Sequence, residues 1–252
     1  VSECARARAL WALGYPDRAL AGVTSALALA QQLSHVQSVV SAAYYAAHLH
    51  LLRGEPALSQ QQAQTAVELA EEHGLELWAA VARIHQAWAA VAQGNAEEGT
   101  IRFRRELAVY ENTGARVWRP LFLGLFAEAL AKTKRLDEAL AAVNEGLTLA
   151  RSTGELYFEA ELHRIKGELL MMQPNGKAIS EAEACFKEAL AIARRQEARS
   201  WELRIVTSVG RLLQTVDKRT EARALIEMAC DSFTEGHETA DFKAARILLN
   251  QL

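Results

Sequence analysis

A small residue recurs about every forty positions along this chain, and this period constrains the fold more than any other feature of the sequence. The successive steps are 40, 40, 40, 43 and 40 residues long. A fixed period of roughly 20 to 50 residues is typical of stacked supersecondary units, not of a globule built around a catalytic cleft. The sequence therefore predicts a repeat array. The recurring residues are Ala19, Ser59, Gly99, Ala139, Ala182 and Ala222.

Turn signals divide each repeat into two helices. Gly14 and Gly54 favour a left-handed end of the first helix, and Pro16 and Pro56 preset the first turn of the second helix. The fifth turn is the longest, which explains the single step of 43 residues. The turns fall at residues 14–17, 54–56, 94–96, 134–137, 173–177 and 216–219.

These signals predict an all-α fold, a right-handed superhelical solenoid of about six helical hairpins in one domain covering residues 1–252. The segment 237–252 has no partner helix and is predicted to be a C-terminal capping helix, because an array needs its open end covered to stay soluble. The apolar stripe of this cap consists of Phe242, Ala245, Leu248 and Leu249. The hairpins are expected over residues 1–33, 34–73, 74–113, 114–153, 154–196 and 197–236.

Small and aromatic residues predict how the helices pack. In the second helix of a hairpin the small residues stand seven apart, as Ala182 and Ala189 do, so they share one face and allow close approach of the two helices. Between hairpins a glycine is followed four residues later by an aromatic residue. The glycine is predicted to cap the preceding helix, and the aromatic residue to open the next helix and pack between repeats. These pairs are Gly74 with Trp78, Gly114 with Trp118, and Gly154 with Phe158; Glu197 replaces the glycine before Trp201.

Composition excludes several classes of protein. Half of the residues are hydrophobic and the formal net charge is −3, which argues against a disordered chain and against a general nucleic-acid binder. Three widely spaced cysteines suggest a reducing compartment. The sequence contains no run of about eighteen apolar residues, so no membrane-spanning helix is predicted. We therefore expect a cytoplasmic protein. Because the chain starts at Val1 with neither an initiator Met nor a signal-peptide pattern, we expect it to be a fragment of a larger protein.

Sequence motifs for catalysis are missing. There is no phosphate-binding loop, no nucleophile elbow and no paired-histidine metal motif. His48 and His50 stand two apart, on different faces of one helix, and Cys185 has no base near it in sequence. We predict no catalytic residue, no metal and no cofactor, so any catalytic domain would lie outside this fragment.

Several phrases carry a resemblance to known families. The small–Leu phrase followed by Ala seven residues later resembles the second helix of tetratricopeptide repeats, lengthened from thirty-four to forty residues. The longer period looks like the sensor region of the maltose-regulon activator group of signal-transduction ATPases. More specifically, the chain resembles the C-terminal repeats of bacterial proteins that join a class III nucleotide cyclase or regulatory head to an AAA-like ATPase. The phrases are 159–170 (EAELHRIKGELL), 182–186 (AEACF), 189–196 (ALAIARRQ) and 218–223 (KRTEAR).

The tetratricopeptide resemblance implies that first helices line a concave groove. Aromatic residues gather in the first half of this predicted groove and charged residues in the second. Arg164 has Glu161 and Glu168 as local ion-pair partners at helical spacing, whereas Arg204 and Arg211 have none so close in sequence and are predicted to hold an anionic group. The predicted groove residues are Arg8, Trp11, Tyr44, His48, Trp88, Glu128, Arg164, Arg204 and Arg211.

The resemblance implies a non-catalytic sensor and interaction module of a multidomain bacterial signalling ATPase. Its expected ligands are a peptide, a partner protein or a small inducer, and its expected partners include other domains of the same chain or a second copy. Two alternatives stay open. A structural or self-assembling scaffold would show an apolar exposed groove or edge. A nucleic-acid-binding repeat would need a continuous basic stripe, which the composition disfavours.

Overall fold

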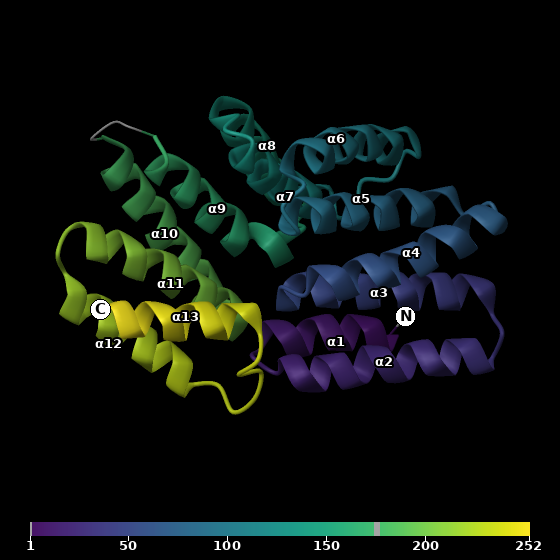
Figure 1. The fold of residues 1–252 in the computed structure, drawn as a ribbon, viewed down its shortest axis with the longest axis horizontal. Coiled ribbons are helices and arrows are strands. Elements are labelled where there is room, and N and C mark those ends of the chain that lie inside the picture. The colour runs from purple at the N-terminus through teal and green to yellow at the C-terminus, as the bar shows by residue number, and fades with distance from the viewer. Residues whose placement is uncertain (1, 174–176) are drawn as a thin grey trace. The chain divides into compact units, whose positions relative to one another are not determined.

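A computed structural model describes residues 2–173 and 177–252, and all regular structure within these ranges is helical (Figure 1). The predicted all-α class is therefore confirmed. The fifth predicted turn, 173–177, falls largely outside the described residues. The helices are α1 (Ser2–Ala12), α2 (Pro16–Gln32), α3 (Val36–Arg53), α4 (Pro56–Glu72), α5 (Glu76–Ala92), α6 (Ala96–Asn112), α7 (Arg119–Lys132), α8 (Leu136–Thr153), the 3-10 helix η1 (Leu156–Phe158), α9 (Glu159–Met171), α10 (Lys177–Arg195), α11 (Arg199–Thr215), α12 (Arg219–Asp231) and α13 (Ala240–Gln251).

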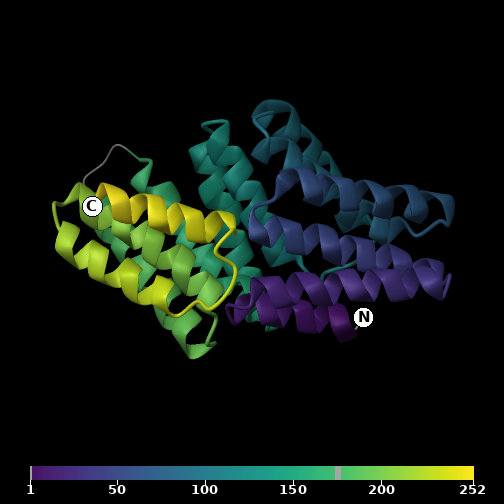
Figure 2. The same ribbon diagram turned by 60° about the horizontal axis from the view of Figure 1, so that its bottom comes forward.

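Consecutive helices pack as hairpins. α3 packs on α4, α5 on α6, α7 on α8, α9 on α10 and α11 on α12, and the views in Figures 1 and 2 agree with these pairings. The odd-numbered helices also contact one another in succession, α3 with α5 and α7 with α9, α9 with α11, and α11 with α13. The predicted repeat of helical hairpins is thus present, and the odd-numbered helices form a layer of their own.

The chain divides into two compact units. Unit 1 comprises residues 2–11 and 15–117, which include most of α1 and all of α2 to α6. Unit 2 comprises 12–14 and 118–252, which include α7 to α13. A single continuous right-handed array over the whole chain stays a prediction.

Close approach within hairpins follows from the small residues identified in the sequence. Ala139 and Ala182 are fully buried on the even-numbered helices. The odd-numbered helices contribute small residues too, because a Cβ atom added at Gly167 of α9 would lie 2.5 Å from the Phe186 ring of α10. No side chain fits there, so this glycine sets the distance between α9 and α10.

Some helix ends adopt the left-handed backbone conformation at a glycine, and others adopt it at a residue with a Cβ atom. Gly74 and Gly154 have φ angles of 65° and 74° and end α4 and α8 in the left-handed conformation, as the sequence predicts. Glu197 takes the same conformation with φ 55° before α11, and Lys134 does so with φ 61° before α8. A residue with a Cβ atom pays roughly 1–2 kcal/mol for this backbone geometry.

The predicted aromatic packing between hairpins is present, with one change of position. The Phe158 and Trp201 rings are buried and meet edge to face with centroids 5.3 Å apart, and Trp78 meets Tyr44 in the same way at 5.5 Å. Trp118 does not open a helix as predicted. It precedes α7 with φ 68°, and its backbone N–H donates to Glu155 Oε1 at 2.8 Å.

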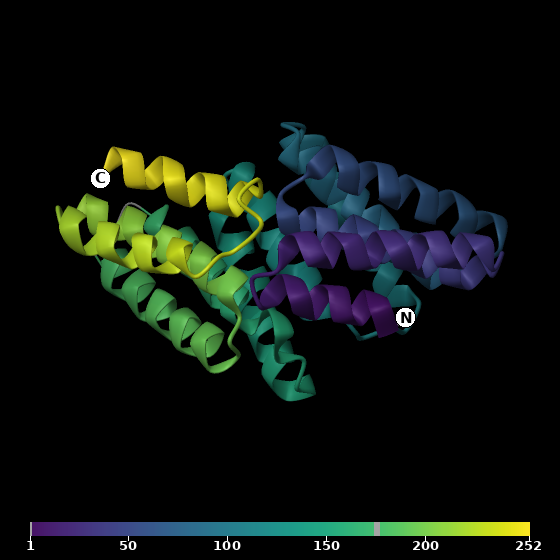
Figure 3. The same ribbon diagram turned by 90° about the horizontal axis from the view of Figure 1, so that it is seen from below.

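The predicted C-terminal cap is confirmed as α13, which lies alongside the hairpin of α11 and α12 (Figure 3). Ala245, Leu248 and Leu249 are buried against α11 and α12, so the apolar stripe faces the last hairpin. Thr239 begins this helix by accepting a hydrogen bond from the N–H of Phe242. Among the described residues, no helix is long and apolar enough to span a bilayer.

Candidate functional site

Every predicted groove residue lies on an odd-numbered helix, so the layer of odd helices is the candidate site. In unit 1 these helices carry aromatic and histidine side chains, and in unit 2 they carry charged ones, as the sequence predicted. We call these two surfaces the odd-helix faces of unit 1 and unit 2. The predicted residues are distributed as Arg8 and Trp11 on α1, Tyr44 and His48 on α3, Trp88 on α5, Glu128 on α7, Arg164 on α9, and Arg204 and Arg211 on α11.

The centre of the unit 2 face is Arg164, whose guanidinium contacts three carboxylates. Nε and Nη2 donate to the two oxygens of Glu161 at 2.7 and 2.8 Å, and Nη2 also donates to Glu128 at 2.8 Å. Nη1 lies 2.8 Å from Glu168. The local pairing with Glu161 and Glu168 that the sequence allowed is therefore present, and Glu128 joins it from α7, 36 residues away.

Arg204 has partners that its sequence neighbourhood does not reveal. Nη1 lies 3.0 Å from Glu161, which is 43 residues away, and Nε lies 2.7 Å from Asp241, which is 37 residues away. Its guanidinium carbon also lies 5.0 Å from the centre of the Trp201 ring. The carboxylates that pair with Arg204 come from neighbouring odd helices, so the local sequence around Arg204 does not reveal them.

Of the three arginines predicted for this face, Arg211 is the most exposed, with 51% of its side chain accessible. Its Nη1 lies 3.6 Å from Glu168, and Glu168 in turn accepts a 2.6 Å hydrogen bond from Ser208. Glu168 thus links α9 to α11 through two side chains. The prediction that Arg204 and Arg211 hold an anion stays a prediction, but each already has a carboxylate beside it.

The electrostatics of this network differ between its middle and its ends. Burial opposes ionisation of Glu161, yet Arg164 and Arg204 outweigh burial and lower its pKa. Burial raises the pKa of Glu128 and of Asp241, and the nearby arginines Arg164 and Arg204 offset this effect only in part. The charge is therefore well compensated at the centre of the network and poorly compensated at both ends.

Sequence reasoning missed Asp241 and Ser208. Asp241 stands 37 residues after Arg204, close to the repeat period, and this spacing was the available signal. The predicted cap at residues 237–252 gives no reason to expect a polar residue on the odd-helix face, although α13 packs on α11 as a further odd helix. No sequence pattern indicates a role for Ser208.

The predicted aromatic and histidine side chains of the unit 1 face are mostly buried, and Arg8 of α1 is half-buried. Trp11, Tyr44 and His48 are each about 1% exposed, which places them in the core rather than on an open wall, and Trp88 is half-buried. His85, which sequence reasoning missed, is fully buried beside them: its Nε2 lies 3.3 Å from His48 Nδ1, and its Nδ1 lies 2.9 Å from the carbonyl of Val81.

These contacts assign the histidine tautomers. His85 Nδ1 donates to the Val81 carbonyl, so His85 Nε2 accepts from His48 Nδ1–H. Burial lowers the pKa of His85 to about 4 and lowers that of His48 as well, with His85 and Arg8 adding to the effect on His48. Both rings are consequently uncharged at neutral pH.

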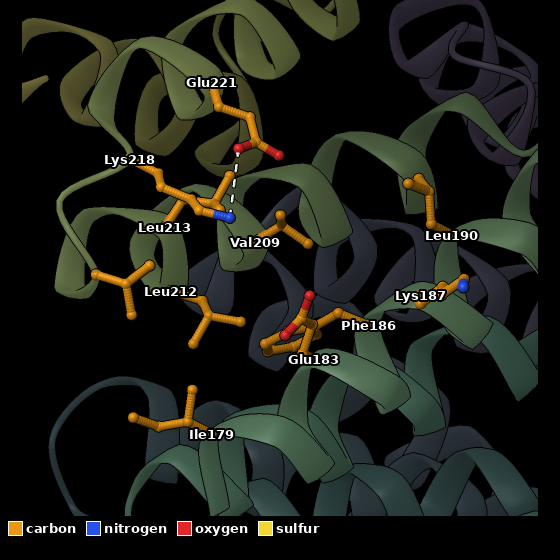
Figure 4. Close-up of a pocket in the computed structure, with 11 residues that line it drawn as sticks. Ile179, Glu183, Phe186, Lys187, Leu190, Val209, Leu212, Leu213, Lys218 and Glu221 are labelled. Carbon is orange, nitrogen blue, oxygen red and sulfur yellow. Dashed lines mark ion pairs between the residues drawn. The ribbon is translucent and has the colours of Figure 1, made fainter.

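Unit 2 also carries an apolar hollow of about 240 Å³ between α10, α11 and the start of α12 (Figure 4). Phe186, Leu212 and Leu213 form part of its lining, and Lys218 lies 3.8 Å from Glu221 at its edge. The hollow has room for an apolar side chain. Within residues 2–173 and 177–252, no three His, Cys, Asp or Glu side chains are grouped as metal ligands.

Comparisons with known proteins identify the fold. No family model matches the chain. The uncharacterized protein R02095 of Rhizobium meliloti (strain 1021) is 24% identical over 212 residues, which are 81% of this chain and 20% of that protein. This chain therefore spans about one fifth of the length of the curated relative that it matches.

Two solved structures are similar over nearly the whole chain. The apo form of RapI matches with a TM-score of 0.60 and 12% identity, covering 98% of this chain and 80% of RapI. BtubC from P. vanneervenii matches with a TM-score of 0.60 and 15% identity, covering 94% of this chain and 93% of BtubC. Both are tetratricopeptide-like helical-repeat proteins, so the likeness shows a tetratricopeptide-like fold for this chain.

Proposed function

We propose that this chain is a non-catalytic protein- or peptide-binding module that serves as the sensor region of a multidomain bacterial signalling ATPase. The repeat fold supports the binding role, since the surfaces of such arrays are extended and suited to partners. The resemblance of the phrase at 159–170 supports the signalling context. The relative in Rhizobium meliloti is about five times as long as the matched segment, which fits a module within a larger protein.

The observation that carries the proposal is the ion network across α7, α9, α11 and α13. Its inner members are rigidly held, since the side chains of Glu161 and Arg164 are 2% and 9% exposed. Its outer members are within reach of a partner: the side chains of Glu128 and Glu168 are each 36% exposed, and that of Arg211 is 51% exposed. Exposed charged side chains that are held in place by buried ions favour specific recognition of a charged partner.

Binding on this face would control other domains only through a difference in affinity. A partner shifts a two-state equilibrium only if it binds one state more tightly than the other. In the proposed role, the partner therefore favours the arrangement of the ATPase domains in which the unit 2 face is free to bind it.

The test uses a segment of the partner found by an unbiased search. A random dodecapeptide library displayed on phage is panned on the protein, and the affinity of the best peptide is measured by fluorescence anisotropy. Glu168→Gln and Arg211→Gln alter the exposed rim of the unit 2 face. The matched control is Glu181→Gln, which alters an exposed carboxylate of α10 in the same unit.

We expect at least one of the two rim variants to weaken binding by about tenfold, the effect of losing one charge-assisted hydrogen bond. The control should bind as the wild type does. Equal affinity in all three variants would place the contact elsewhere and refute the proposal for this face.

A further inference from the structure

We infer that this chain associates with a second copy of itself, and that Ile101 of one copy inserts into the apolar hollow between α10, α11 and α12 of the other. The contact joins unit 1 of one copy to unit 2 of the next. It uses the outer side of α6 and the hollow, not the odd-helix faces, so the inference goes beyond the proposed function and does not depend on it.

The first step is the exposure of Ile101. Three large apolar side chains of the described residues are about two-thirds exposed: Leu33 at 67%, Ile101 at 66% and Met228 at 67%. A single exposed apolar side chain is ordinary on a protein surface. The repeat, however, shows what the scaffold needs at each position, and so it allows a comparison.

The scaffold does not need a large apolar residue at the position of Ile101. The equivalent positions of the other five hairpins are all exposed, and each carries an alanine or a glutamine. Packing of the hairpin therefore does not explain Ile101, whereas a contact with another molecule does. The equivalent residues are Ala21, Gln61, Ala141, Ala184 and Ala224.

The second step is a surface that can receive this side chain. The hollow of unit 2 measures about 240 Å³, and Phe186, Leu212 and Leu213 form part of its apolar lining. Two further lining residues, Ile179 and Val216, are each 44% exposed. Insertion of an isoleucine side chain covers these residues, and it removes apolar surface of both copies from water.

The third step is the charge around the hollow. Figure 4 shows Lys218 joined to Glu221 by a dashed line, at a distance of 3.8 Å, while Glu183 and Lys187 stand apart from that pair on α10. Within the described residues, Glu183 and Lys187 form no ion pair. The hollow is thus bordered by one carboxylate and one ammonium group available to a partner, one helical turn apart along α10.

Ile101 stands between charges of opposite sign on α6. Glu97–Glu98 come one turn before it and Arg104–Arg105 one turn after it, and Arg104 and Arg105 are exposed like the two glutamates. When α6 of one copy lies antiparallel to α10 of the other, the glutamates face Lys187 and the arginines face Glu183. The two surfaces are therefore complementary in charge as well as in shape.

The other two exposed apolar side chains lack this complementarity. Leu33 has no Asp, Glu, Lys or Arg within four positions on either side, and Met228 has only acidic residues within the same distance. Of the three, Ile101 alone matches the charges that border the hollow. Because α6 and the hollow are unlike surfaces, the contact is heterologous, and association can extend beyond a dimer.

The first experiment measures association by sedimentation equilibrium of the protein at concentrations that rise towards the millimolar range. The mean mass of the wild type is expected to rise with concentration. Ile101→Ala introduces the residue that most other hairpins carry at this position, and it should weaken association by at least about tenfold, because the buried methyl groups are lost. Leu33→Ala and Met228→Ala are the matched controls and should associate as the wild type does.

A charge variant tests the orientation of the two helices. Glu183→Lys places a cation opposite the arginines of α6 and should weaken association by about threefold, the effect of one exposed ion pair. Its control is Glu181→Lys, which makes the same change at an exposed residue of α10 outside the hollow, and which should have little effect. Equal effects of the two variants would refute the antiparallel contact.

A cross-linking experiment locates the contact directly. Ile101→Cys and Val216→Cys are prepared separately, mixed and oxidised, and a disulfide-linked dimer is expected in the mixture but not in either variant alone. The wild type is the blank, since Cys4 and Cys230 are buried and Cys185 is half-buried. Met228→Cys mixed with Val216→Cys is the control, and the melting temperature of each variant verifies that it is folded.

Three results would overturn the inference. The first is a wild type that stays monomeric at every concentration, which would leave the hollow to a different occupant. The second is association that Ile101→Ala does not weaken, and the third is association without cross-linking between positions 101 and 216. None of these results bears on the peptide-binding test of the unit 2 odd-helix face, so the proposed function stands or falls separately.

Discussion

The two odd-helix faces bury polar side chains on the same kind of scaffold, but they do so by opposite means. In unit 1, His48 and His85 are fully buried as neutral rings in one hydrogen-bonded pair. In unit 2, Glu161 and Arg164 are as well buried, but as ions that neutralise each other. The repeated hairpin therefore fixes where a polar group lies, while the identity of its neighbours decides whether that group is charged.

This difference separates the roles of the two faces. A neutral histidine pair packed under aromatic rings contributes to the core of unit 1 and offers little to a partner from outside. An ion network with exposed ends can exchange one of its internal contacts for a contact with a ligand. A buried network of this kind is also costly to break, since each ion depends on its partner to offset its desolvation.

The largest expected effect is the loss of the central cation of unit 2. Arg164→Met leaves three carboxylates without their common partner and should lower the free energy of unfolding by about 3–5 kcal/mol. Arg211→Met, at a half-exposed position, should cost less than about 1 kcal/mol. Urea denaturation followed by circular dichroism measures both. Equal costs for the two variants would mean that Arg164 does not organise the network.

Acid is expected to weaken unit 1 more than unit 2, because unit 1 has two fully buried histidines, whereas unit 2 has the part-buried His163, whose pKa burial and then Arg151 also lower. The pKa of His85 is lowered from 6.5 to about 4, so the unfolded chain binds a proton first as the pH falls. The stability that the neutral ring contributes is present above pH 6.5 and is lost as the pH falls towards about 4, by about 1.4 kcal/mol per pH unit and on the order of 3 kcal/mol in all.

Hydrogen exchange, expressed as protection factors at several pH values, tests this difference. Amides of α3 and α5 should lose protection between pH 6.5 and 5, while those of α11 and α13, which contain no histidine, should keep it. In unit 2 the raised pKa values of Glu128 and Asp241 act with the opposite sign, because the folded form binds those protons first. Loss of amide protection in α11 at a higher pH than in α3 and α5 would contradict this expectation.

A smaller effect is expected from helix spacing. Gly167→Ala places a Cβ atom 2.5 Å from the Phe186 ring, which is 1% exposed and cannot turn away. The clash should cost roughly 1–2 kcal/mol after the gain of about 1 kcal/mol in helix propensity. Unit 1 has Ala87 at the corresponding repeat position, and Ala87→Gly there should cost about 1 kcal/mol through propensity alone. Thermal melts of both variants compare the two spacings; a stabilised Gly167→Ala protein would show that α9 and α10 can separate freely.

The smallest effect concerns the left-handed position before α11. Glu197 is exposed and has a φ angle of 55°. The corresponding position in a repeat of unit 1 is Gly74, which ends α4. Glu197→Gly should raise the free energy of unfolding by up to about 1 kcal/mol, because relief of the strained backbone exceeds the added freedom of the unfolded chain. A lowered melting temperature would indicate that the Glu197 side chain makes a contact that outweighs its backbone strain.

Much of the fold was predictable because it depends on short-range patterns. Helix ends follow from residues within a few positions of each end, as at Gly74 and Gly154, and the small residues repeat at a fixed step. The local pairing of Arg164 with Glu161 and Glu168 was predictable for the same reason, since all three lie within two turns of one helix.

The wider network could not be predicted, because its remaining contacts join residues on different helices. Arg204 meets Glu161 and Asp241 across 43 and 37 residues, and which of many acids it meets depends on the rotation and spacing of packed helices. The sequence by itself thus determined the helical repeat, its phase and the helices that carry the predicted site residues. Only the tertiary structure decided which charges are compensated and which are exposed, because ion pairing between helices depends on distances of a few ångströms that no sequence period specifies.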